Sequence, residues 1–165
     1  MSTSSIAILG CGNIGASIAK GLAKSGMKTN NIILTRRKVK QLDNLKKSGF
    51  QVKNNNGFAV NNSQIILLTV GPSQLMGLLD EIAPHLNQNH LLISIVSGVT
   101  ISEIQSRVNN KIHIIRAMPN TAACLGESMT CLSSLNGFHK GLKKAQDLFN
   151  NIGQTLVIDE DQMAS

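Results

Sequence analysis

Aromatic residues are nearly absent from this chain of 165 residues, which has no Trp, no Tyr and four Phe. Proteins that bind single-stranded nucleic acid stack the bases on aromatic side chains, so this scarcity argues against such a role despite the formal net charge of +7. The positive charge is also concentrated, because seven of the sixteen basic residues lie between positions 36 and 53, where Asp43 is the one acid. This distribution favours a local phosphate site surrounded by solvated lysines over a nucleic-acid interface.

Cysteines and long apolar runs are also scarce. The three cysteines, Cys11, Cys124 and Cys131, form no C-x-x-C pair, and an odd number favours reduced thiols over a disulfide framework or a zinc site. No apolar run approaches the ~20 residues that span a bilayer. The first residues lack the basic region of a secretory signal. We therefore expect a cytoplasmic protein without nucleic-acid, membrane or metal partners.

Short apolar runs alternate with amphipathic stretches along the first two thirds of the chain. Strands are predicted at 6–9, 32–34, 50–52, 65–70, 91–95 and 112–115, and helices at 13–26, 36–48, 75–82 and 101–108. This alternation predicts an α/β, doubly wound Rossmann fold with a mostly parallel sheet. Beyond Arg116 a short extra strand pair, 129–132 and 155–158, is expected on either side of a helix at 137–150, and residues 53–57 are expected to form a turn.

A glycine-rich motif, Gly10-Cys-Gly12-Asn-Ile-Gly15, joins the first predicted strand to the first predicted helix. In the dinucleotide-binding fingerprint the first glycine permits a tight turn, the second lets the backbone approach a pyrophosphate, and the third brings helix and strand close together. The helix N-terminus would present free N–H groups to the phosphates. The Cys11 side chain is expected to face the cofactor. A tight turn in an unrelated α/β domain is the alternative.

The end of the second predicted strand discriminates between NAD and NADP. An NAD site usually has Asp or Glu there, which accepts a hydrogen bond from the ribose 2′-OH. This chain has Thr35, Arg36 and Arg37 instead. A guanidinium binds a 2′-phosphate through two charge-assisted hydrogen bonds, whereas an acid would repel it. We therefore predict an NADP(H) site in which Arg36 is the main contact, with two exposed arginines at the start of a basic helix as the alternative.

The segment Arg116-Ala-Met-Pro-Asn-Thr121 follows the sixth predicted strand, at the sheet edge where doubly wound proteins bind ligands. Pro119 cannot continue the strand, so the chain must turn there. Asn120 and Thr121 would then offer polar groups near the nicotinamide. By its residues alone, the segment fits an ordinary capped turn equally well.

This segment resembles the signature of the pyrroline-5-carboxylate reductases, the enzymes of the last step of proline biosynthesis. Further stretches are similar to the same family in the same order: residues 8–15, Asn56, residues 69–72, 94–101 and 126–130. The chain differs from the usual family pattern at Gly71, Ser97, Ala122 and Ser128. The resemblance extends from residue 6 to about residue 160.

The resemblance implies an NADP-binding Rossmann domain at residues 1–160, followed at 161–165 by the start of a C-terminal helical domain for dimerisation and substrate binding. Family members are oxidoreductases that reduce the cyclic imine 1-pyrroline-5-carboxylate to L-proline with NADPH, or sometimes NADH. The chain would then be the cofactor-binding half of such an enzyme, inactive alone, and a homo-oligomer only together with that second domain.

Motifs and resemblance together give a candidate site of two parts. The cofactor-binding residues are Gly10, Gly12, Asn13, Ile14, Gly15, Thr35, Arg36, Arg37, Asn56, Val70, Gly71, Pro72, Ser97 and Gly98, and the residues bordering the imine are Met118, Pro119 and Asn120. No catalytic side chain is assigned, because the cofactor supplies the hydride and the protein mainly orients the reactants. His85, His90 and His113 are expected to be structural. An NADP(H)-binding module without turnover and a related imine or β-hydroxyacid-type oxidoreductase are the alternative functions.

Overall fold

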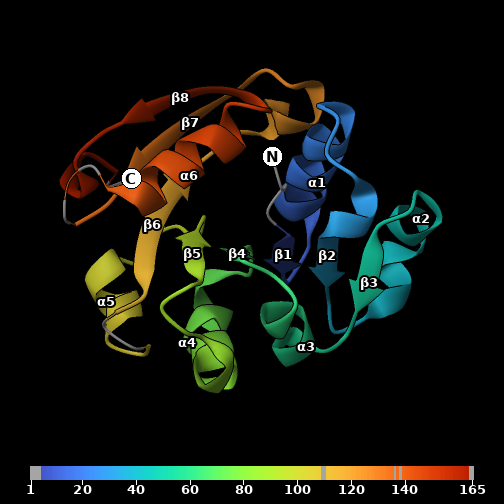
Figure 1. The fold of residues 1–165 in the computed structure, drawn as a ribbon, viewed down its shortest axis with the longest axis horizontal. Helices are drawn as coiled ribbons and strands as arrows, with labels where there is room; N and C mark the ends of the chain where they lie inside the picture. Colours follow the sequence, from blue (N-terminus) through green and yellow to red (C-terminus); the bar gives the residue numbers. More distant parts are fainter. Residues whose placement is uncertain (1–4, 109–110, 136, 138, 164–165) are drawn as a thin grey trace.

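The protein is built on one twisted sheet, seen in a computed structural model that describes residues 5–108, 111–135, 137 and 139–163. The strands of these residues are β1 (Ile6–Leu9), β2 (Ile32–Thr35), β3 (Gln51–Lys53), β4 (Ile65–Leu68), β5 (Leu91–Ser94), β6 (His113–Met118), β7 (Ser128–Ser133) and β8 (Gly153–Val157). Their order across the sheet is β3-β2-β1-β4-β5-β6-β7-β8. Strands β1 to β6 are parallel, β7 is antiparallel to β6, and β8 is parallel to β7 (Figure 1).

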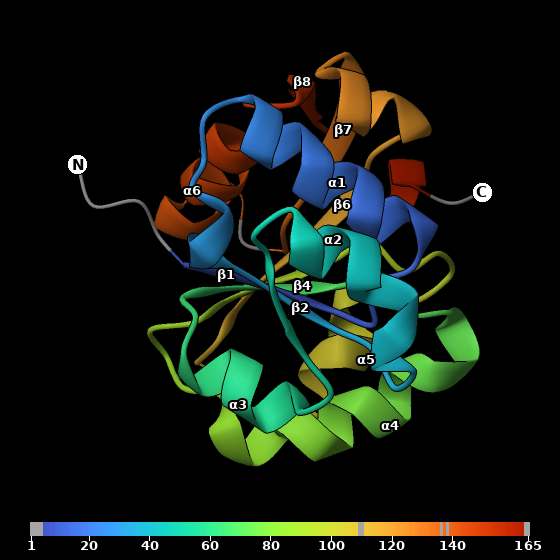
Figure 2. The same ribbon diagram turned by 90° about the vertical axis from the view of Figure 1, so that its right-hand side faces the viewer.

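Helices cover both faces of this sheet (Figure 2). One face packs against α1 (Asn13–Lys24), α2 (Asp43–Lys47) and α6 (Lys140–Phe149), and the other against α3 (Asn56–Asn61), α4 (Pro72–Ile82) and α5 (Ile101–Gln105). The predicted doubly wound α/β fold and the extra strand pair at its C-terminal end are confirmed. Of the expected second-domain start at 161–165, residues 164 and 165 lie outside the described residues, as does residue 138 of the expected helix at 137–150.

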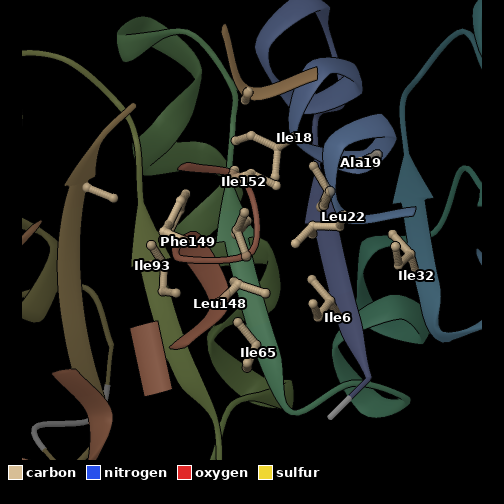
Figure 3. Packing of buried hydrophobic residues seen from close by; sticks show 14 of the residues in the cluster. Ile6, Ile18, Ala19, Leu22, Ile32, Ile65, Ile93, Leu148, Phe149 and Ile152 are labelled. Carbon is tan, nitrogen blue, oxygen red and sulfur yellow. The ribbon is translucent and has the colours of Figure 1, made fainter. Parts of the chain in front are cut away.

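Two hydrophobic cores lie on opposite sides of the central strands. Side chains alternate along β1, so that Ile6 and Ile8 enter the core beneath α1 while Ala7 and Leu9 enter the core above α4. Figure 3 shows the first core, where Ile18 and Leu22 of α1 and the end of α6 meet the strands. Every residue of β1, β2, β4 and β5 is buried. Burial on both faces of the sheet therefore explains why the sequences of these strands are apolar runs.

Three elements differ from the sequence-based expectation. Residues 56 and 57 do not belong to a turn but begin α3, because the Asn55 side chain caps that helix by accepting the N–H of Phe58 at 2.9 Å. The charged stretch after β2 forms a 3-10 turn, Val39–Leu42, followed by the short α2 rather than one continuous helix. Strand β6 continues to Met118, because β7 provides antiparallel partners for residues 116–118.

Helix α1 also packs against the 3-10 turn η4 (Thr121–Leu125), which follows β6. The two elements lie close together at Gly21, where a Cβ atom would collide with the carbonyl oxygen of Ala123 and approach the side chain of Ile152. Glycine is required here by space, although it is a poor helix former. Gly77 of α4 differs, because no atom lies within 4 Å of the position that its Cβ would occupy.

We expect Gly21→Ala to lower the free energy of unfolding by about 1–3 kcal/mol, the usual cost of overpacking, despite the higher helix propensity of alanine. The matched control, Gly77→Ala, should raise it by about 0.5–1 kcal/mol, since only the propensity changes. Urea denaturation of the two variants and the unchanged protein measures both effects. Equal stabilisation by both substitutions would contradict the packing of α1 against η4.

Candidate functional site

A groove of about 840 Å³ opens at the carboxyl ends of β1, β2 and β4. In the sheet, β2 lies on one side of β1, and the later strands β4 to β6 lie on the other side of β1. This reversal of strand order is the position at which doubly wound sheets bind ligands. The groove is lined by the loops after these three strands, by Asn54 and Asn56, and by one side of α4 as far as Glu81.

The three glycines of the 10–15 loop occupy positions that only glycine fits or that leave space for a ligand. Gly10 has φ +72°, and the Val70 side chain fills the place of its missing Cβ. Gly15 is buried, and a Cβ there would lie 3.1 Å from both Ile8 Cγ2 and Thr69 Oγ1. Gly12 is different, since nothing lies within 4 Å of its Cβ position on the groove wall. The backbone is therefore closely packed on one side and open on the other.

Helix α1 begins directly after Gly12 without a side-chain cap. The first N–H groups of a helix have no intrahelical acceptor, and they carry the positive end of the helix dipole. Asn13 is exposed and Ile14 is half-buried at this end of the helix. The loop and the helix start therefore offer N–H groups to an anion beside the open Gly12.

The expectation that Cys11 faces the cofactor is wrong. Its side chain is fully buried in the core beneath α1, next to Gly15. Burial raises the pKa of the Cys11 thiol to about 11, against the smaller opposing effects of Arg36 and Lys20. Only its backbone serves the site, since Cys11 N–H donates to the Thr35 carbonyl oxygen at 2.8 Å and thereby joins the ends of β1 and β2.

Arg36 lies at the end of β2 with its guanidinium held against the glycine loop. Its Nη1 donates to the carbonyl oxygen of Cys11 at 3.4 Å, and its backbone N–H donates to the carbonyl oxygen of Lys53 at 3.3 Å. Arg36 is half-buried, whereas Arg37 and Lys38 are exposed, and all three line the groove. Three cationic side chains therefore meet at one end of the groove, where a phosphate would be bound by charge and by the guanidinium fork.

A chain of hydrogen bonds along the groove lining links β2 to α4 through Asn56. Thr35 Oγ1 accepts the N–H of Gly10 at 3.3 Å and donates to Asn56 Oδ1 at 2.5 Å. Asn56 Nδ2 in turn donates to both carboxylate oxygens of Glu81, at 3.2 and 3.3 Å. Glu81 is the single acid among the groove-lining residues, and sequence reasoning missed it. The sequence positions of Asn56 and Glu81 do not indicate that the two side chains are in contact, because this contact depends on how α3 and α4 pack.

The remaining predicted site residues lie along the same carboxyl edge of the sheet but are divided between two places. Val70 and Gly71 line the groove, and Pro72 begins α4 beside them, where Gln74 Oε1 accepts the N–H of Gly71. The others lie outside the groove lining. Ser97 and Gly98 are in the exposed turn after β5, with Gly98 at φ +76°, while Met118 ends β6 and Pro119 and Asn120 follow it.

Asn120 caps the turn that follows β6, since its Oδ1 accepts the N–H of Ala122 at 3.2 Å. Of the residues predicted for the glycine loop and the end of β2, the structure brings Gly10, Gly12, Thr35, Arg36 and Arg37 into one groove. Of the residues predicted for the nicotinamide and the imine, Val70, Gly71 and Pro72 follow β4, and the others lie at the neighbouring ends of β5 and β6.

Two of the histidines expected to be structural, His90 and His113, contact other parts of the fold. His90 is buried, with Nε2 at 3.0 Å from the Val60 carbonyl oxygen and Nδ1 accepting the N–H of Asn87 at 3.0 Å. His113 stacks on His139 at 4.7 Å, and His139 caps α6. Among the described residues, no three His, Cys, Asp or Glu side chains come close enough to hold a metal ion. In the same residues, no helix is long and apolar enough to cross a membrane.

We expect iodoacetamide at pH 8 to alkylate Cys124 and Cys131 in the folded protein and to spare Cys11. The thiolate is the nucleophile, and a buried thiol with a pKa of about 11 is protonated at this pH. Peptide mapping by mass spectrometry identifies the modified residues, and the same reaction in guanidinium chloride should modify all three. Modification of Cys11 at the rate of Cys124 in the native protein would place its side chain in the groove after all.

Comparison with known proteins identifies similar sequences and structures over nearly the whole chain. Residues 5–98 match the family model described as "NADP oxidoreductase coenzyme F420-dependent". Two proteins of Dictyostelium discoideum, pyrroline-5-carboxylate reductases 1 and 2, are 39% and 38% identical over 96% and 97% of the chain. The structure of Plasmodium falciparum pyrroline carboxylate reductase with NADP bound superimposes with a TM-score of 0.87 over 99% of the chain, at 27% identity.

The chain spans 31% and 59% of the lengths of the two Dictyostelium proteins and 60% of the Plasmodium chain. These matches confirm the resemblance to the N-terminal, cofactor-binding part of pyrroline-5-carboxylate reductases. The family model covers more than half of the chain, and its match lies over the glycine loop, Arg36 and the groove. The chain belongs to the family of NADP oxidoreductases described as coenzyme F420-dependent.

Proposed function

We propose that this chain is the NADP(H)-binding part of an NADPH-dependent pyrroline-5-carboxylate reductase, an oxidoreductase that reduces a cyclic imine to L-proline. The observation that carries the proposal is the pairing of Arg36 at the end of β2 with the open Gly12 at the end of β1, in one groove. The names of its relatives support the substrate, and the NADP bound to the Plasmodium protein supports the cofactor.

The residues of the groove fit NADP(H) better than NAD(H). The end of β2 has no acid to accept hydrogen bonds from a free ribose 2′-OH, and three cations line the groove there. Arg36, Arg37 and Lys38 would hold the 2′-phosphate, while the N–H groups after Gly12 would bind the pyrophosphate. Asn56, fixed between Thr35 and Glu81, would lie beside the adenosine ribose.

The nicotinamide and the imine would lie further along the same edge. Ser97 and Gly98 after β5 would border the nicotinamide, together with Val70, Gly71 and Pro72, and Met118, Pro119 and Asn120 at the end of β6 would border the imine. When bound, the cofactor supplies the hydride, and the protein's contribution is to orient the two reactants and to exclude water. We further propose that the protein acts in the cytoplasm, where its three free thiols stay reduced.

Arg36→Ala should weaken NADPH binding by about ten- to hundredfold and leave NADH binding nearly unchanged. A bidentate, charge-assisted contact to the 2′-phosphate contributes roughly 1.5–3 kcal/mol, and NADH lacks the 2′-phosphate. Titration calorimetry with both nucleotides measures the change in selectivity. Arg107→Ala is the matched control, because Arg107 is an exposed arginine paired with Asp80 away from the groove.

Equal affinity of the unchanged protein for NADPH and NADH would refute the assignment of the cofactor. A similar loss of NADPH binding in Arg107→Ala would show that general positive charge, rather than the position of Arg36, attracts the nucleotide.

A polypeptide of residues 1–165 should bind NADPH but reduce pyrroline-5-carboxylate far more slowly than a full-length relative such as pyrroline-5-carboxylate reductase 2 of Dictyostelium. Among the described residues, Met118 at the end of β6 and Asn120 after it are exposed, so this part of the chain does not enclose an imine. Loss of orientation can remove up to ~7–11 kcal/mol of barrier lowering. A spectrophotometric NADPH assay compares the two proteins, and equal turnover would mean that residues 1–165 contain the whole substrate site.

A further inference from the structure

The first residue of the 116–121 segment lies in the sheet rather than in the groove. Arg116 is buried in β6, and its Nη1 lies 3.6 Å from Glu160 Oε1. The two side chains are 8% and 16% exposed, so this ion pair is shielded from water. Glu160 comes from the other end of the described chain, where it begins the 3-10 turn η5 (Glu160–Met163).

The same carboxylate oxygen holds a second element. Glu160 Oε1 accepts the backbone N–H of Ile101, the first residue of α5, at 2.6 Å. The same helix start also has a capping box, because Thr100 and Glu103 cap each other through bonds of 2.7 and 3.2 Å. One oxygen therefore links the start of α5 to the middle of β6.

Both linked elements carry residues of the proposed nicotinamide end. Ile101 follows Gly98 by three residues, and Arg116 precedes Met118 by two. Strand pairing between β5 and β6 ends at Ser94 and Arg116, so the turn at 95–100 extends beyond the ladder. Glu160 contacts Ile101 directly after this turn, and the ion pair with Arg116 holds the Glu160 side chain in place.

We infer that Glu160 is a positioning residue for the nicotinamide end of the site, acting through Ile101 and Arg116 on the turn at 95–100 and on the end of β6. This inference rests on the proposed NADP(H) function. Under this inference η5 helps to position the site, although η5 contributes no residue to the groove. The phosphate-binding end, at Gly12 and Arg36, has its own contacts and should not depend on Glu160.

The experiment compares two ligands, NADP⁺ and 2′-phospho-ADP-ribose, which lacks the nicotinamide. Glu160→Ala should weaken NADP⁺ binding by about tenfold, the equivalent of one charge-assisted hydrogen bond, and change binding of 2′-phospho-ADP-ribose by less than about twofold. It should also shift the nicotinamide fluorescence of bound NADPH. Glu160→Gln keeps an oxygen for the Ile101 N–H and should restore most of the NADP⁺ affinity.

Asp161→Asn is the matched control, since it removes one negative charge from the same turn at an exposed position and should leave both ligands unaffected. If Glu160→Ala does not fold, the double variant Arg116→Met/Glu160→Leu gives the same comparison. That variant leaves no buried unpaired charge but still lacks the acceptor for Ile101.

Equal weakening of both ligands, or no effect on either, would overturn the positioning role while leaving the proposed function intact. An unchanged protein that binds neither ligand would instead refute the proposed function, and with it the role of Glu160.

Discussion

The contact of α1 with the rest of the fold is the constraint on which the site depends. Gly15 brings the start of the helix onto β1 and β4, and Gly21 brings its second half against the backbone of η4. Ser17, between these glycines, donates its hydroxyl to the Thr121 carbonyl oxygen at 3.2 Å and accepts the N–H of Cys124 at 3.1 Å. One helix therefore places the phosphate-binding loop and, through η4, the end of the 116–121 segment.

Only part of the chain's excess positive charge lies in the groove. Of the basic segment at 36–53, Arg36, Arg37 and Lys38 line the groove, whereas Lys46 and Lys47 are exposed on α2 outside it. The one acid among the groove-lining residues, Glu81, accepts hydrogen bonds from the Asn56 amide. Positive potential is therefore concentrated at the end of β2, where a phosphate and not a ribose hydroxyl would gain most from it.

The sequence predicts what depends on local patterns and misses what depends on packing between distant elements. Buried strands such as 65–68 are recognisable because both faces are apolar, and the glycine loop is recognisable because its steric requirements are local. The orientation of Cys11 was predicted wrongly, since the turn at Gly10 directs the next side chain into the core. The contacts of Asn56 with Glu81 and of Arg116 with Glu160 join residues 25 and 44 positions apart, and no short motif encodes them.

The two ends of the proposed site differ in how completely the described residues build them. At the ends of β1, β2 and β4, the groove has walls on both sides and a network of fixed hydrogen bonds. At the end of β6, by contrast, Met118 is 39% exposed and the Asn120 side chain accepts its hydrogen bond from within its own turn. Binding a dinucleotide needs the first end, whereas fixing an imine against the nicotinamide needs an enclosed second end. Nucleotide affinity and turnover are therefore separable properties of this fold, because they depend on different strands.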